Sequence, residues 1–126
     1  MDSIHEEFMN RPRVYISGPI TQGNRNVNYF QAVEAERKLM LAGFAPLNPM
    51  RSMTLPFAWQ EDMPHELWLQ VDLPWVECAD AVYRLPGVSK GADLECKHAE
   101  ALGIPVFISA KSLEAWRDNR RTAEVA

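Results

Sequence analysis

The sequence has few cysteines, no long apolar run and no excess of positive charge. Its two cysteines, Cys78 and Cys96, form neither a CxxC pair nor a disulfide framework. No apolar stretch approaches the ~20 residues that a membrane-spanning helix needs, and residues 1–11 lack the apolar core of a signal peptide. We therefore expect a soluble protein of a reducing compartment, most simply the cytoplasm.

The charge balance limits the classes of ligand. The chain has 13 Lys and Arg against 17 Asp and Glu, a net charge of −4, which excludes the basic surface typical of duplex nucleic-acid binding. Anionic small molecules remain compatible, because a pocket can be positive on an acidic protein. His5, His65 and His98 show no metal-ligand spacing, so we expect no metal and no other cofactor.

Length and composition predict one domain over residues 1–126. This is enough chain for one ordinary domain and too little for two, and 47% hydrophobic and 24% charged residues match globular proteins. No repeat or linker divides the chain. Residues 1–12 form a polar lead-in with room for a short helix over residues 4–9.

Strand-like and helix-like segments alternate along the rest of the chain. β-Branched and aromatic runs that end at Gly or Pro predict strands at residues 14–17, 44–47, 81–85 and 104–108. Apolar residues at helical spacing predict helices at residues 28–42, 64–79, 89–102 and 113–123. This alternation predicts an α/β fold, a three-layer Rossmann-like (flavodoxin-like) parallel sheet with helices on both faces.

Local signals refine this assignment. Gly43 is expected to close the first helix, and Pro74 to remove one backbone donor from the second. The segment that follows residue 47 through Pro56 is rich in Pro and Met, which predicts a loop. The apolar stripe of the first helix is predicted to consist of Phe30, Val33, Met40 and Leu41.

Two carboxylates fall on the apolar faces of successive predicted helices. At 100° per residue, Glu95 lies within the stripe of Ala92, Cys96, Ala99 and Leu102. Asp72 lies on the face of Trp68, Trp75, Val76 and Ala79. Because an unpartnered buried carboxylate is costly, each is either a hydrogen-bonded core acid or a functional group. An ionised carboxylate beside a proton-donating one is the pair that glycosyl transfer uses.

Two turns at the expected carboxyl edge of the sheet are rich in glycine and hydroxyl groups. Ser89, Lys90 and Gly91 open a helix directly after a strand, where backbone donors can hold an anion, although Ser89 can equally be a simple N-cap. Residues 17–21, with the sequence SGPIT, form a second turn that can also be a plain strand end. Neither turn has a P-loop lysine or GxGxxG spacing, so an NTPase or dinucleotide site is not supported.

In their order and spacing, these segments resemble the nucleoside 2-deoxyribosyltransferase superfamily. The nearest branches are the Rcl-type 2′-deoxynucleoside 5′-phosphate N-hydrolases and their short, often phage-borne relatives. The resemblance covers most of residues 13–108 and rests on the segments VYISG at 14–18, DLPW at 72–75 with AD at 79–80, SKGADLE at 89–95 and GIPV at 103–106.

The resemblance implies a role for most of the candidate residues. Glu95 would be the nucleophile that attacks the anomeric carbon, Asp72 would assist departure of the base, and Tyr15 would orient Glu95 through a hydrogen bond. The 5′ end of the substrate would lie among Ser17, Gly18, Pro19, Ile20, Ser89 and Gly91. Residues 48–64, which should line the base pocket, match nothing in the family, so Trp59, His65 and Trp68 are candidates from their chemistry alone to stack on or hydrogen-bond the base. The alternative is that the aromatics belong to the core and that His65 lies on the surface.

The implied activity is hydrolysis of the N-glycosidic bond of a (deoxy)nucleoside 5′-monophosphate through a covalent intermediate. The alternatives are a nucleoside 2-deoxyribosyltransferase, which passes the sugar to a second base, and a non-catalytic nucleotide sensor. The resemblance also implies a homodimer or higher homo-oligomer, with Trp116 and Arg117 as candidate contributors to the pocket. Asp93 departs from the hydrolases, which have glycine there, and adds negative charge near the expected phosphate.

Overall fold

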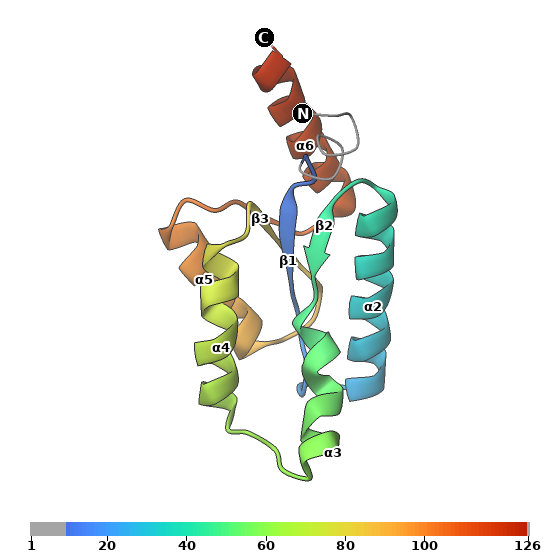
Figure 1. Ribbon diagram of the computed structural model, residues 1–126, viewed down its shortest axis with the longest axis vertical. Helices are drawn as coiled ribbons and strands as arrows, with labels where there is room; N and C mark the ends of the chain where they lie inside the picture. Colours follow the sequence, from blue (N-terminus) through green and yellow to red (C-terminus); the bar gives the residue numbers. More distant parts are fainter. Residues whose placement is uncertain (1–9, 126) are drawn as a thin grey trace.

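The computed structural model describes residues 10–125 and shows a parallel sheet between two helical layers (Figure 1). The four strands have the order β2-β1-β3-β4. They are β1 (Arg13–Ser17), β2 (Ala45–Leu47), β3 (Ala81–Arg84) and β4 (Val106–Phe107). The predicted three-layer α/β fold is therefore confirmed, whereas the short helix predicted over residues 4–9 lies outside the described residues.

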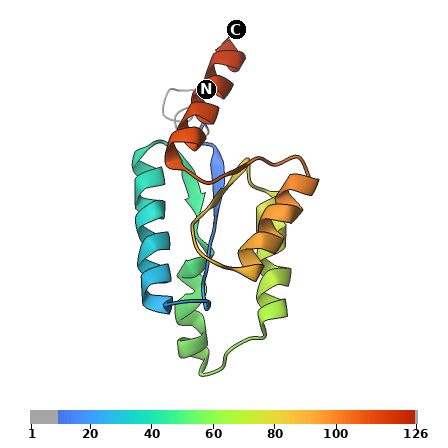
Figure 2. The same cartoon turned by 180° about the vertical axis from the view of Figure 1, so that it is seen from behind.

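The helices are divided between the two faces of the sheet, as the opposite view also shows (Figure 2). On one face lies α2 (Arg25–Leu41); on the other lie α4 (His65–Glu77) and α5 (Lys90–Ala101). The last helix, α6 (Ala110–Val125), lies at the opposite end of the molecule from α3 (Leu55–Trp59) (Figure 1). In the described part of the chain, no helix combines the length and apolarity needed to cross a membrane.

Alternation along β1 assigns its side chains to opposite faces of the sheet. Val14 and Ile16 belong to the core cluster on the α2 side, and Tyr15 belongs to the second cluster, on the α4–α5 side. By the same alternation, Ser17 faces α5. The strand therefore presents the hydroxyl groups of Tyr15 and Ser17 to the same helix.

The segment after β2 is helical where a loop was predicted. A 3₁₀ helix, η1 (Pro49–Thr54), is followed directly by α3. The Asn48 side chain caps η1 by accepting a hydrogen bond from the backbone N–H of Met50, at 3.0 Å. Because proline is favoured in the first turn of a helix, Pro49 marks a helix start rather than a loop.

The predicted apolar stripe of α2 is wrong. Phe30 and Leu41 are 69% and 75% exposed, and Val33 and Met40 are also exposed. The helix instead buries Asn28, Ala32, Ala35 and Leu39. These four residues follow helical spacing, but three of them are small or polar, so hydropathy alone does not reveal the stripe.

Other local predictions are partly correct. Gly43 has φ of +92° directly after α2, and its N–H donates to the carbonyl of Met40, so the predicted helix end is confirmed. Helix α4 continues through Pro74. Trp75 and Leu102 were predicted on buried faces but are 56% and 53% exposed.

Candidate active site

Glu95 is a buried carboxylate held by two side chains of β1. The residue is only 6% exposed. The Tyr15 hydroxyl donates a hydrogen bond to its Oε2 atom, and the Ser17 hydroxyl donates to its Oε1 atom at 2.8 Å. The Tyr15–Glu95 contact implied by the family resemblance is thus present. Both donors reach Glu95 because alternate residues of β1 face α5.

The environment of Glu95 acts on its pKa in two directions. Burial raises the pKa above its ordinary value, while the Tyr15 and Ser17 donors and the charge of Arg84 lower it, leaving the pKa raised overall. The pKa of Tyr15 is also raised, by burial first and then by the charge of Glu95. Tyr15 therefore stays protonated and continues to donate to the carboxylate.

Asp72 lies across the same site on α4 and is half-buried. Burial and then the negative charge of Glu95 raise its pKa to about 7. At neutral pH, Asp72 is therefore protonated in part of the molecules and ionised in the rest. A carboxyl with this pKa can give up a proton and later accept one.

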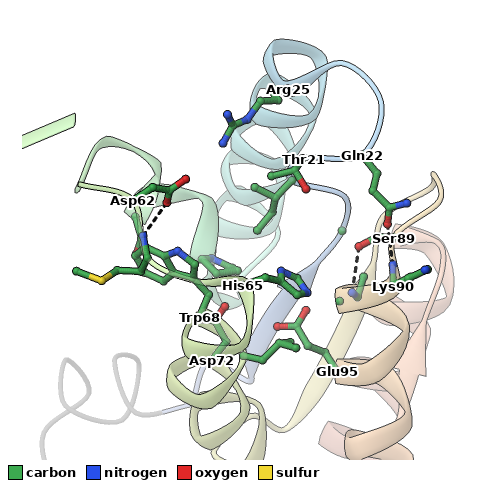
Figure 3. Close-up of a pocket in the computed structure, with 18 of the residues that line it drawn as sticks. Thr21, Gln22, Arg25, Asp62, His65, Trp68, Asp72, Ser89, Lys90 and Glu95 are labelled. Atoms are coloured by element: carbon green, nitrogen blue, oxygen red, sulfur yellow. Dashed lines mark hydrogen bonds between the residues drawn. The ribbon is translucent and has the colours of Figure 1, made fainter. Parts of the chain in front are cut away.

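Both carboxylates border an open pocket of about 400 Å³ (Figure 3). The pocket lies where the loop after β1, the start of α4 and the start of α5 meet, at the carboxyl edge of the sheet, where ligands bind in such folds. Residues predicted for substrate binding that line it are Gly18, Ile20, His65, Trp68, Ser89 and Gly91.

His65 and Gly91 form one corner of this pocket. A Cβ atom on Gly91 would lie 3.3 Å from Cε1 of His65, so the glycine lets the imidazole lie against the first turn of α5. Figure 3 shows this ring between Thr21 and Glu95. The ring has exposed surface but faces the ligand space, which combines the two alternatives considered for His65.

Three predicted substrate-binding residues lie elsewhere. Ser17 is fully buried beneath the pocket and contacts Glu95. Pro19 lies on the other side of the loop, where it borders a separate groove with Gly87. Trp59 does not line the pocket, but stacks on Trp68 with ring centroids 6.2 Å apart. Trp59 thus contributes to the pocket wall through its contact with Trp68.

Ser89 caps α5, as the simpler alternative predicted. Its hydroxyl oxygen accepts a hydrogen bond from the backbone N–H of Ala92, at 3.1 Å. Ser89 also lines the pocket. Its hydroxyl proton is not used by the cap, so Ser89 can still donate to a ligand.

Arg25 also lines the pocket, although it was not predicted as a site residue from the sequence. It is the first residue of α2, and Figure 3 shows its side chain at the rim of the pocket. Asn24 caps α2 by accepting from the backbone N–H groups of Asn26 and Val27. Asn is a preferred N-cap residue, and this signal would have moved the predicted helix start from residue 28 to Arg25.

Two further features bear on the expectations based on the family. Asp93 is paired with Arg84 at 3.1 Å, so its negative charge is partly balanced. Arg117 donates to the carbonyl of Ala42, at the end of α2 remote from the pocket, and Trp116 packs on Phe107. Within this chain, neither lines the pocket. Among the described residues, no cluster of His, Cys, Asp and Glu is arranged to hold a metal ion.

The sheet order and the layer arrangement define a flavodoxin-like α/β fold. The chain is similar in structure to a 2-deoxyribosyltransferase from the psychrotolerant bacterium Bacillus psychrosaccharolyticus, with a TM-score of 0.56 and 22% sequence identity. The similarity covers 75% of this chain and 69% of that chain, and at this identity it is a likeness of fold. No curated protein matches the sequence.

Residues 12–108 match the family model DUF4406, described as a domain of unknown function. The match spans more than half of the chain, and the protein belongs to this family. The matched segment includes Tyr15, Asp72 and Glu95, so the buried carboxylate site lies within the family domain.

Proposed function

We propose that the protein is a nucleotide N-glycosidase that converts a (deoxy)nucleoside 5′-monophosphate into free base and (deoxy)ribose 5-phosphate. The observation that carries this proposal is the Glu95 carboxylate, held by Tyr15 and Ser17 in a pocket that also contains Asp72. The pKa of Asp72, about 7, supplies the partner acid that such a reaction needs.

In the first step, a Glu95 carboxylate oxygen attacks C1′ of the sugar. The bond between C1′ and the base nitrogen breaks, and its electron pair leaves with the base. Protonated Asp72 transfers its proton to the departing base, which lowers the barrier for a poor leaving group. The product of this step is a glycosyl ester on Glu95 and an ionised Asp72.

In the second step, water attacks C1′ of the glycosyl ester. Ionised Asp72 accepts a proton from this water, the bond between C1′ and the Glu95 oxygen breaks, and Glu95 is released as a carboxylate. Each step inverts C1′, so the two steps together retain its configuration. Tyr15 and Ser17 hold the carboxylate in position throughout.

The other pocket residues support a nucleotide as substrate. Arg25 provides a positive charge at the rim, and the Ser89 hydroxyl at the start of α5 can donate a hydrogen bond, both of which favour a 5′-phosphate. Trp68 offers an aromatic surface for the base, supported by its stack on Trp59. Asp93 opposes this binding less than its charge suggests, because Arg84 pairs with it.

A second candidate function is transfer of the sugar to another base. It shares the covalent step, and the structurally similar protein from Bacillus psychrosaccharolyticus is a 2-deoxyribosyltransferase. The two reactions differ only in the acceptor that attacks the glycosyl ester. A non-catalytic sensor would have no use for a buried carboxylate beside an acid whose pKa is near neutrality.

The test is chromatography of the protein incubated with each deoxy- and ribonucleoside 5′-monophosphate. We expect release of a free base by the wild type and by Glu100→Ala, which changes an exposed carboxylate of the same helix, and no release by Glu95→Ala. Base exchange between nucleosides without hydrolysis would replace this proposal with the transferase. Substantial base release by Glu95→Ala would overturn both.

A further inference from the structure

Gln22 separates two hollows at the carboxyl edge of the sheet. One is the pocket that contains Glu95, and the other is an open groove of about 540 Å³ bordered by Pro19, Gly87 and Val88. Among the described residues, Gln22 is the one that borders both hollows. The pocket and the groove thus meet at Gln22.

Gln22 is held by hydrogen bonds at its side chain and at its backbone. The Gln22 side-chain oxygen accepts a hydrogen bond from the backbone N–H of Lys90, at 2.9 Å (Figure 3). The Gln22 backbone carbonyl accepts from the side-chain amide of Asn28, at 2.8 Å. The same Asn28 amide, which is buried, donates to the carbonyl of Ile20 at 3.2 Å. The loop backbone is therefore fixed relative to α2, and the Gln22 side chain is fixed relative to α5.

The contact with Lys90 uses a group that otherwise favours an anion. The backbone N–H groups in the first turn of a helix have no partner within the helix. The Lys90 N–H points away from α5 and is taken by Gln22, while the N–H of Ala92 is taken by the cap residue Ser89. An anionic oxygen that reached Lys90 would first have to displace the Gln22 side chain.

We propose that Gln22 sets the length of substrate that the pocket accepts at its 5′ end. With Gln22 bound to Lys90, the pocket takes a nucleoside 5′-monophosphate and excludes the additional phosphate of a diphosphate. Shortening the side chain joins the pocket to the groove and frees the Lys90 N–H for an oxygen of the β-phosphate. This inference rests on the proposed function, because it takes the 5′ end of a nucleotide to lie beside the start of α5.

The test compares nucleoside 5′-diphosphate with 5′-monophosphate in Gln22→Ala. We expect the ratio of kcat/KM for the diphosphate to that for the monophosphate to rise by about tenfold over the wild type, the gain from one new hydrogen bond to a charged group. Gln31→Ala, which borders only the groove, should keep the wild-type ratio. Gln22→Glu keeps an acceptor for Lys90 but adds a negative charge, so its ratio should not rise.

Isothermal titration calorimetry with the same two ligands, on the inactive Glu95→Gln with and without Gln22→Ala, separates this inference from the proposed function. A wild type that hydrolyses monophosphates, combined with an unchanged ratio in Gln22→Ala, would overturn the role of Gln22 alone. A wild type that binds nucleotides without releasing base would overturn the proposed hydrolysis, and the ratio of dissociation constants would then test Gln22. Failure of both proteins to bind either nucleotide would overturn both.

Discussion

The two faces of the sheet bury different kinds of side chain. On the α2 side, Val14 and Ile16 pack against Ala32, Ala35 and Leu39, and this cluster is apolar. On the α4–α5 side, Tyr15 lies among Val76, Val82 and Ala99, but its hydroxyl reaches the buried carboxylate of Glu95. The α2 face buries a mostly apolar core that includes the neutral amide of Asn28, whereas the other face buries the carboxylate of Glu95, whose desolvation opposes folding more strongly.

This difference indicates where function and stability are located. Hydrogen bonds from Tyr15 and Ser17 offset part of the cost of burying Glu95, but its pKa is still raised by burial. An apolar residue at position 95 would avoid that cost. A carboxylate kept at such a position is better explained by chemistry than by stability, and substitutions on the two faces should separate the two properties.

The largest expected effect is on catalysis, from Glu95→Gln. Replacing the nucleophile with an amide of similar size should lower kcat by at least about 1,000-fold. Thermal unfolding should change little, because the amide removes a buried carboxylate while leaving the side-chain volume nearly unchanged. Base release and circular-dichroism melts check both parts, and a variant with near wild-type turnover would contradict the assignment.

On the opposite face, Leu39→Ala should affect stability instead. Leu39 is 2% exposed, so its truncation should lower the free energy of unfolding by about 3 kcal/mol. Turnover per folded molecule should stay at the wild-type level, because Leu39 does not line the pocket. Urea unfolding measures the stability, and base release per folded molecule measures the turnover. A variant that is stable but inactive would contradict the assignment of stability to the α2 face and catalysis to the α4–α5 face.

Asp72→Asn should lower kcat/KM by about 100-fold for bases that leave poorly and by less for bases that leave readily. The proposed acid must be protonated in the first step, so wild-type kcat/KM should fall as pH rises through about 7. The asparagine variant should lose this alkaline decline. Profiles of kcat/KM against pH for the wild type and Asp72→Asn check this expectation. Equal slowing for every base would contradict a leaving-group role.

The same carboxyl makes a smaller contribution to stability. The pKa of Asp72 in the folded protein, about 7, lies above its ordinary value, because burial disfavours the ionised form. Because the fold favours the protonated carboxyl, Asp72 adds to the free energy of unfolding at low pH, and this stabilisation is lost as pH rises through about 7. Since Asp72 is only half-buried, Asp72→Asn should raise the free energy of unfolding at pH 8 by about 1 kcal/mol and have less effect at pH 5.

Much of this architecture could be predicted from the sequence. Strand runs and helix spacing indicated the α/β fold, and the helical position of Glu95 marked it as buried before any contact was known. Helical spacing could not show which strand residues would contact that carboxylate. For Tyr15, the expected contact came from the family resemblance. Asp72 was predicted on a face with tryptophans, of which Trp68 lines the same pocket and Trp75 is exposed. Burial and then the charge of Glu95 raise the pKa of Asp72.

The misses have specific physical causes. The core stripe of α2 uses alanines and a buried asparagine, whose burial depends on close packing rather than hydropathy. The role of Asn28 depends on loop carbonyls six and eight residues away in the chain. Gln22 contacts Lys90 across 68 positions, and no local pattern predicts a contact of that kind.

The measurement that tests the central claim most directly is the mass of a trapped intermediate. The protein is quenched with acid during turnover of a nucleoside 5′-monophosphate, digested and examined by mass spectrometry. The account predicts a (deoxy)ribose 5-phosphate adduct on the peptide that contains Glu95, absent from Glu95→Gln. An adduct on another residue, or undiminished base release by Glu95→Gln, would contradict it.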